Sequence, residues 1–138
     1  MDLTIQEKVE LILSFYTWHG YLKESICEFP EAEKFVENDF AFLDEDTEMY
    51  KMNERGEAFL HKEIKHISQE FISYMKANRD VVSLEDAKKW FSCTYFLDQS
   101  TATELMEYIC KNLSTYGYIA NWSHSSKFGE RINLQKIQ

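Results

Sequence analysis

The longest regular pattern in this 138-residue chain is a helical one that follows Asn53. Its apolar residues recur at spacings of 4, 3, 4 and 3: Leu60, Ile64, Ile67, Phe71 and Tyr74. Such spacing places the five side chains on one face of an α-helix. Asn53 is a favoured N-cap residue, and Glu54 and Glu57 stand in the first turn, where the helix dipole favours carboxylates. The sequence therefore predicts a helix over residues 54–77, and any fold must cover its apolar face.

This apolar face allows two interpretations. It can pack within its own domain, or it can pair with a second copy of the chain as a homodimer seam formed by Leu60, Ile64, Ile67 and Phe71. The pattern covers two heptads, fewer than the three or four that identify a coiled coil. Packing within the domain is therefore favoured, and the homodimer stays open.

The rest of the chain also favours helices. Four Gly and one Pro are too few for a multi-stranded β protein rich in turns, and 21 aromatic residues supply large core side chains. We expect four further helices and two hairpins: helices at 5–17, 31–36, 84–96 and 101–114, and hairpins at 40–52 and 118–134. The predicted fold class is mainly α with small β-hairpins, that is, α+β.

Capping signals support these limits. Thr4-Ile-Gln-Glu7 and Thr101-Ala-Thr-Glu104 both have the form of a capping box, and Ser83 is placed to cap the helix after it. Gly117 follows the last predicted helix, as a C-terminal cap does. In the first hairpin, aromatic and apolar residues alternate on either side of an acidic tip, residues 44–47. In the second, strands at 118–122 and 131–134 enclose a loop that contains Gly129.

Residues 50–60 carry a resemblance to a known family. They read Tyr-Lys-Met-Asn-Glu-Arg-Gly-Glu-Ala-Phe-Leu, with an amide cap at Asn53, a glycine at Gly56 and an apolar pair at the end. This run resembles the winged-helix version of the helix-turn-helix fold, at the point where the second wing strand enters the following helix. Both halves of the chain have its order of helices followed by a hairpin. The resemblance implies two winged-helix-like modules, 1–78 and 79–138, joined by the long helix.

The acidic segment, residues 24–48, carries the net charge of the chain. It holds ten carboxylates and one basic residue, Lys34, for a net charge of −9, which equals the formal total. Such a segment is either a solvated helix face with a polar hairpin tip or a docking surface whose local field attracts basic partners. We therefore predict an intracellular adaptor, inhibitor or regulatory subunit that is not an enzyme and that docks a basic protein, at the extreme as a nucleic-acid mimic. The candidate residues are Glu28, Glu31, Glu37, Asp39, Asp44, Glu45, Asp46 and Glu48.

Four aromatic residues near the end of the first helix are candidate anchors for the same partner, provided that they are exposed: Tyr16, Trp18, Tyr21 and Phe29. Aromatic side chains are common anchors in protein interfaces, and core packing is their alternative role.

DNA binding is the alternative function. Phosphate contacts from Lys and Arg supply most non-specific affinity for DNA, and the acidic segment opposes such contacts in the first module. The second module is neutral, with seven basic and seven acidic residues over 79–138. A transcription regulator would bind DNA there through Lys111, Asn112, Lys127 and Arg131, and it would be a dimer where the apolar face of the long helix forms the homodimer seam. A structural part of a larger assembly is a third hypothesis.

No motif indicates catalysis, a cofactor or a metal. His61 and His66 are five residues apart, off the i,i+4 spacing that places two ligands on one helical face. No apolar run suits a signal peptide or a membrane span, which favours an intracellular, cytoplasmic location. The cysteines Cys27, Cys93 and Cys110 lack metal spacing and are expected to be buried, reduced thiols.

Overall fold

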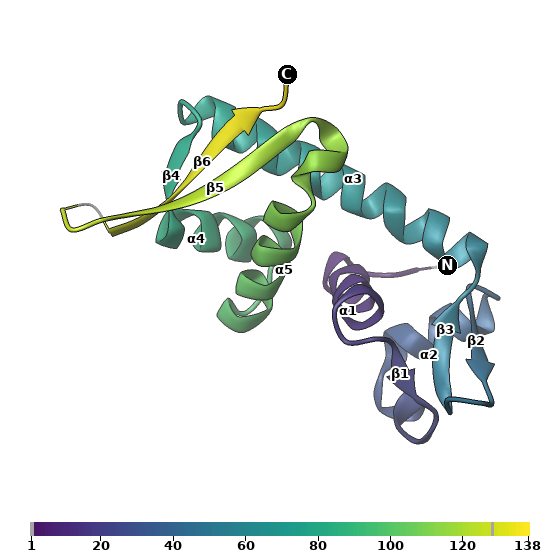
Figure 1. The fold of residues 1–138 in the computed structure, drawn as a ribbon. Helices are drawn as coiled ribbons and strands as arrows, with labels where there is room; N and C mark the ends of the chain where they lie inside the picture. The colour runs from purple at the N-terminus through teal and green to yellow at the C-terminus, as the bar shows by residue number, and fades with distance from the viewer. Residues whose placement is uncertain (1, 128) are drawn as a thin grey trace. The chain divides into compact units, whose positions relative to one another are not determined.

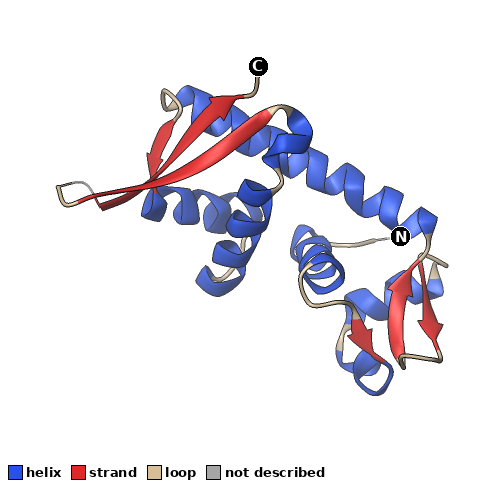
Figure 2. Ribbon diagram, viewed as in Figure 1, coloured by secondary structure: helices blue, strands red, loops and turns tan. Residues whose placement is uncertain are grey.

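The computed structural model describes residues 2–127 and 129–138. The chain is an α+β protein in which helices predominate and each of two small antiparallel sheets has three strands (Figures 1 and 2). It divides into two compact units, Met1–Ile64 and Lys65–Gln138, which we call the first unit and the second unit. The division falls inside the long helix α3, Glu54–Ala77, as predicted over 54–77. The predicted module boundary at 78 lies just after the last residue of this helix.

The first unit begins with a helix and ends with the start of α3. Its elements before α3 are α1 (Ile5–Tyr16), β1 (Tyr21–Leu22), the 3-10 helix η1 (Lys23–Glu28), α2 (Pro30–Glu37), β2 (Ala41–Asp44) and β3 (Met49–Met52). In sheet A the strand order is β1-β3-β2, so the second strand of the hairpin is central (Figure 1). The predicted hairpin and both helices are confirmed. The two-residue strand β1 is too short to leave an alternating pattern in the sequence.

Hydrogen bonds from backbone N–H groups to capping side chains explain where two of the helices start. The Thr4 hydroxyl accepts from the N–H of Glu7 at 3.1 Å, and the Glu7 carboxylate accepts from the N–H of Thr4 at 3.0 Å, which confirms the capping box. Asn53 caps α3, since its Oδ1 accepts from the N–H of Gly56 at 2.9 Å. A Cβ at Gly56 would lie 2.2 Å from the carbonyl oxygen of Phe40. The glycine therefore allows the close backbone approach that the sequence predicted.

Aromatic rings fill the core of the first unit. Phe35 is fully buried, and its ring centroid lies 5.2 Å from that of Phe40 and 5.8 Å from that of Phe59. Phe15 joins this cluster and also contacts Tyr21 edge to face at 5.4 Å. Helices α1, α2 and α3 therefore meet the hairpin through large rings, as a small core with few side chains requires.

The second unit has a similar order of elements, but two α-helices and then a 3-10 helix separate its short strand from its hairpin, where the first unit has a 3-10 helix and one α-helix. After the second half of α3 come β4 (Val81–Ser83), α4 (Leu84–Tyr95), α5 (Gln99–Lys111), the 3-10 helix η2 (Leu113–Tyr116), β5 (Tyr118–Ser125) and β6 (Gly129–Lys136). Sheet B has the strand order β4-β6-β5, again with the second hairpin strand in the centre. The strands of this hairpin are longer than predicted and reduce the expected loop at 123–130 to its tip.

Caps in the second unit confirm one prediction and correct another. The Ser83 hydroxyl accepts from the N–H of Asp86 at 3.0 Å and starts α4, as predicted. Helix α5 starts earlier than its predicted capping box, because the Asp98 carboxylate accepts from the N–H of Thr101 at 2.7 Å. Thr101 therefore lies in the first turn. Gly117, with φ +88°, caps the 3-10 helix η2; the predicted helix 101–114 itself ends earlier, at Lys111, with Asn112 as its C-cap.

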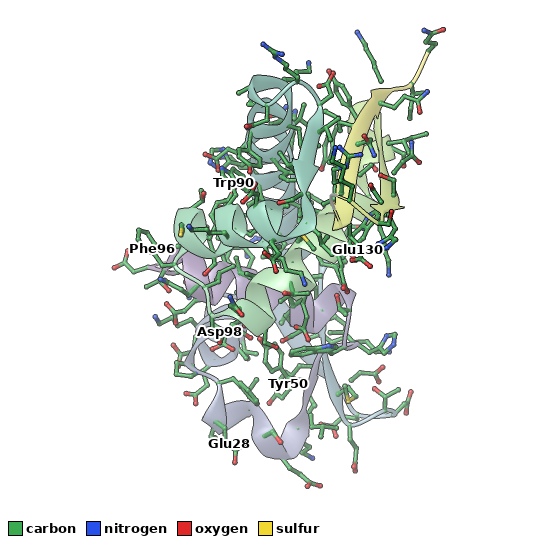
Figure 3. The ribbon with its side chains drawn as sticks, turned by 90° about the vertical axis from the view of Figure 1, so that its left-hand side faces the viewer. Glu28, Tyr50, Trp90, Phe96, Asp98 and Glu130 are labelled. Atoms are coloured by element: carbon green, nitrogen blue, oxygen red, sulfur yellow. The ribbon has the colours of Figure 1, made fainter. Side chains whose placement is uncertain are left out.

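A second aromatic cluster forms the core of this unit, around Trp90 (Figure 3). Phe71 of α3 lies 4.9 Å from Phe91, and Trp90 stacks on Tyr74 at 5.0 Å (ring centroids). Tyr95 completes the cluster and donates a hydrogen bond from its hydroxyl to Glu70 at 2.9 Å. The two units thus have separate aromatic cores, each with its own part of α3.

The cysteines are not all buried. Cys27 and Cys93 are exposed, and only Cys110 is buried, which corrects the expectation of three buried thiols. Cys27 lies on the short helix η1, none of whose residues is buried, and Cys93 lies on the solvent side of α4. Burial raises the pKa of the Cys110 thiol to about 12.

Candidate protein-docking surface

The acidic hairpin β2–β3 is held by hydrogen bonds at its turn. The Asp44 carboxylate accepts from the Lys51 ammonium group at 2.6 Å and from the N–H of Asp46 at 3.0 Å. The hydrogen bond from Lys51 is the main reason why the pKa of Asp44 lies below its ordinary value. Asp44 therefore shapes the turn, and the exposed carboxylates of the tip are those of Glu45, Asp46 and Glu48.

Sheet A has one buried and one exposed face. Because side chains alternate along a strand, Tyr21 and Ala41 point inward, and their neighbours Leu22 and Phe42 point outward. Leu22 is 56% exposed and Phe42 is 47% exposed. Met49 of β3 lies opposite Leu22 and is half-buried. We call Leu22, Phe42 and Met49 the outer apolar patch; it lies on the sheet that carries the acidic tip. The paired Asp44 and Lys51 lie on the same face, opposite Met49 and Phe42 respectively.

Most of the carboxylates that the sequence predicted as a docking site are exposed. They are Glu28 at the end of η1 (Figure 3), Glu37, Asp39, Glu45, Asp46 and Glu48, while Asp44 is half-buried. Glu31 corrects the prediction. It is 7% exposed, and its carboxylate accepts from the Tyr21 hydroxyl at 3.2 Å. Glu31 therefore belongs to the interior of the first unit and not to its surface.

Some exposed carboxylates have basic neighbours outside the acidic segment. Lys23 lies 3.7 Å from Glu45, and Arg55 lies 3.6 Å from Asp39. Exposed pairs of this kind contribute little, typically less than about 1 kcal/mol. Even with these pairs, the first unit is strongly acidic, with sixteen acidic and six basic residues. The second unit has eight acidic and nine basic residues.

The four candidate aromatic anchors divide between surface and interior. Trp18 is 51% exposed and Phe29 is 38% exposed, whereas Tyr21 is buried and Tyr16 is half-buried. Burial raises the pKa of the Tyr21 hydroxyl. The exposed Leu22 and Phe42 were not predicted from the sequence as part of the docking surface. The alternating pattern places Phe40 and Phe42 on one face of a strand, but in the structure Phe40 precedes β2 and packs on Phe35 and Phe59, whereas Phe42 is exposed.

The predicted DNA-binding residues lie on three elements of the second unit. Lys111 is exposed in the last turn of α5, Lys127 is exposed in the β5–β6 turn, and Arg131 is half-buried on β6. Asn112 ends α5, and its side-chain amide donates to the carbonyl of Tyr108 at 2.7 Å. This amide is therefore already engaged in the helix end. The exposed Glu107 and the half-buried Glu104 add negative charge to α5.

The predicted homodimer seam is not on the surface. Leu60, Ile67 and Phe71 are fully buried, and Ile64 is 4% exposed. Leu60 and Ile64 belong to the first unit, and Ile67 and Phe71 belong to the second. The chain itself covers these side chains, which favours packing within the chain over the predicted homodimer seam.

Among the described residues, no three His, Cys, Asp or Glu side chains are placed to hold a metal ion. A shallow hollow of the first unit is lined by Asp2, Glu7, Lys34 and Phe59, among others, and the Glu7 carboxylate is already hydrogen-bonded within the chain. The Glu7 carboxylate binds the N–H of Thr4 and the Lys34 ammonium group at 3.1 Å. No helix in the described part of the chain has the length and apolar character to cross a membrane.

Comparisons of the chain with models of protein families, with curated protein sequences and with solved structures give no match.

Proposed function

We propose that this protein is a non-enzymatic interaction module that docks a basic protein through its first unit. The observation that carries the proposal is the combination, on one sheet, of the outer apolar patch and the acidic tip formed by Glu45, Asp46 and Glu48. Exposed apolar side chains contribute affinity when a partner covers them, and carboxylates beside them steer and orient a basic partner.

This arrangement suits a partner segment with basic residues on one side and apolar residues on the other. Its apolar side would cover Leu22, Phe42 and Met49, and its basic side would meet the hairpin tip. Docking of such a partner is compatible with a role of this protein as an adaptor, an inhibitor or a regulatory subunit. A nucleic-acid mimic needs carboxylates alone, and the apolar patch therefore supports an amphipathic protein segment instead.

A model peptide tests the proposal directly. We would titrate an amphipathic Lys/Leu peptide into the ¹⁵N-labelled protein and follow the backbone amide signals. Shifts are expected in β1, β2 and β3 and not in the second unit, and the affinity should fall as salt rises. A Glu/Leu peptide of the same pattern is the control and should not bind. Equal shifts in both units, or binding of both peptides, would contradict a specific docking surface.

Matched variants then separate charge from apolar contact. Replacing Glu45, Asp46 and Glu48 by their amides should weaken binding of the Lys/Leu peptide about tenfold and slow its association. The control replaces Glu104, Glu107 and Glu130 of the second unit in the same way, which removes three charges elsewhere, and should leave affinity within about twofold. Asp44 is left intact because it holds the turn.

The two units also support the proposal that each is a winged-helix domain. Both have the predicted order of helices followed by a hairpin, and both place the second hairpin strand in the centre of the sheet. DNA binding through the second unit has less support, because Asn112 is engaged and two glutamates lie on α5. Changing Lys127 and Arg131 to Ala tests it: a DNA binder should lose affinity and salt sensitivity together.

A further inference from the structure

The four sheet edges of the molecule differ greatly in length. In both sheets the outer strands are the short strand and the first strand of the hairpin. The edges β1, β2 and β4 have two, four and three residues, whereas β5 has eight, Tyr118–Ser125. Edge strands present backbone N–H and C=O groups that can pair with another chain, and short length is one means by which proteins prevent this.

Strand β5 also lacks the other usual means of protection. Charged residues, proline and bulges keep edges from pairing, and β5 contains no Asp, Glu, Lys, Arg, Pro or Gly. None of its eight residues is buried. Ile119 is 44% exposed and Trp122 is 46% exposed, one on each face of the strand. By contrast, the edge strand β2 of the first unit ends at the charged pair between Asp44 and Lys51.

We propose that β5 pairs antiparallel with β5 of a second copy of this chain, so that the two copies share one continuous sheet. This inference concerns the second unit and is independent of the docking proposal. Symmetry favours a second copy as the occupant. Self-pairing places like residues close together, which opposes pairing of a charged strand, and β5 has no charge that would repel its copy.

Symmetry also limits the register. A two-fold axis that relates antiparallel neighbours is perpendicular to the sheet, so each side chain meets one that points to the same face. The axis must therefore lie at one residue of β5, which then faces the same residue of the other copy. An axis midway between two residues would pair side chains that point to opposite faces of the sheet. Near the middle of β5 that residue is Asn121 or Trp122. In the first register Trp122 faces Ala120 of the other copy, and in the second the two Trp122 side chains face each other. Both registers cover the exposed indole.

Sedimentation equilibrium tests the proposal on the full chain under reducing conditions, which exclude disulfides through the exposed Cys27 and Cys93. We expect a reversible dimer, and we expect Trp122→Lys to raise its dissociation constant at least tenfold. Trp18→Lys is the matched control, since Trp18 is similarly exposed but lies in the first unit. A chain that stays monomeric at several hundred micromolar, or a dimer that both variants weaken equally, would overturn the proposal.

A second pair of variants guards against loss of folding. Ile119→Lys changes the edge strand, whereas Ile137→Lys changes a residue of nearly equal exposure after the central strand. Only Ile119→Lys should weaken the dimer. Hydrogen exchange identifies the paired edge: amides of β5 should exchange more slowly at high protein concentration, while those of β2 should not change. A dimer in which β5 amides exchange at the same rate at both concentrations would rule out pairing through this strand.

Discussion

The first and second units have a similar order of elements and the same strand order, but their surfaces differ in kind. The first unit has short edges and a net excess of ten carboxylates, and the second has a long uncharged edge and a near-balance of charge. The core residues that specify helices and a central hairpin strand are therefore compatible with very different exteriors. Function in such a pair of units is determined by surface residues and not by the shared order of elements.

The largest difference in stability loss between matched substitutions should come from the close backbone packing at Gly56 in the first unit. Gly56→Ala should lower the free energy of unfolding by about 3 kcal/mol, because its Cβ would meet the Phe40 carbonyl at 2.2 Å. Gly117→Ala in the second unit is the comparison: it has φ +88° but no atom within 4 Å of an added Cβ, and should cost about 1 kcal/mol. Urea denaturation measures both. Equal losses would show that the close approach in the first unit relaxes.

Removing a carboxylate that accepts a tyrosine hydroxyl should cost more stability in the first unit, where the carboxylate is buried, than in the second, where it is exposed. Glu31→Ala should cost about 2 kcal/mol, since it removes the buried acceptor of the Tyr21 hydroxyl, and Glu31→Gln should cost less because an acceptor oxygen remains. Glu70→Ala removes the acceptor of the Tyr95 hydroxyl in the second unit, but its side chain is 40% exposed. Water can replace it there, and less than about 1 kcal/mol should be lost. Thermal unfolding of the three variants checks this order.

The helix caps offer a matched pair with similar effects. Thr4→Ala in the first unit and Ser83→Ala in the second each remove one side-chain cap, and each should cost about 1 kcal/mol. Restoring a cap with Thr4→Ser or Ser83→Thr should recover most of the loss. If the urea midpoint of one Ala variant fell much further than that of the other, helices α1 and α4 would differ in how strongly they depend on their side-chain caps.

Lowering the pH should change stability less than the three sets of substitutions described above. Hydrogen bonds from the N–H groups of Thr4 and Thr101 hold the pKa values of Glu7 and Asp98 below their ordinary ranges. The unfolded chain then binds protons more readily, so this stabilisation is complete above the unfolded pKa and is lost as pH falls through the folded pKa. The urea midpoint should therefore fall below about pH 4. Glu7→Gln and Asp98→Asn should each flatten that fall, and an unchanged pH profile would contradict the assignment.

The sequence predicted most of the local structure because the signals were local. The seam from Leu60 to Phe71, the Thr4 and Ser83 caps and the glycine at Gly56 all act within one helix or at one helix end. The short strands β1 and β4 were missed because two or three residues leave no periodicity, and they exist only because β3 and β6 offer them a pairing edge. Pairing between distant segments leaves no trace in a single strand's pattern.

The candidate site was predicted less well than the fold. Charge located the acidic segment, but burial decides which carboxylates a partner can meet, and Glu31 lies inside because Tyr21 provides a hydrogen bond there. The exposed Leu22 and Phe42 could not be distinguished from core residues, since the sequence does not give the direction of the first side chain in a strand. Cys27 and Cys93 were expected in the interior for another reason, because cysteines without a disulfide or metal partner are usually buried; the structure places both on exposed positions of helices.

The exposure of these two thiols has a practical consequence. Cys27 lies in the first unit and Cys93 in the second, while the third thiol, Cys110, is buried and has a raised pKa, which makes it slow to react. The native chain thus offers one accessible labelling position on each unit. A donor and an acceptor dye attached there would report, by energy transfer between single molecules, whether the two units keep a fixed separation in solution and whether a docked peptide changes it.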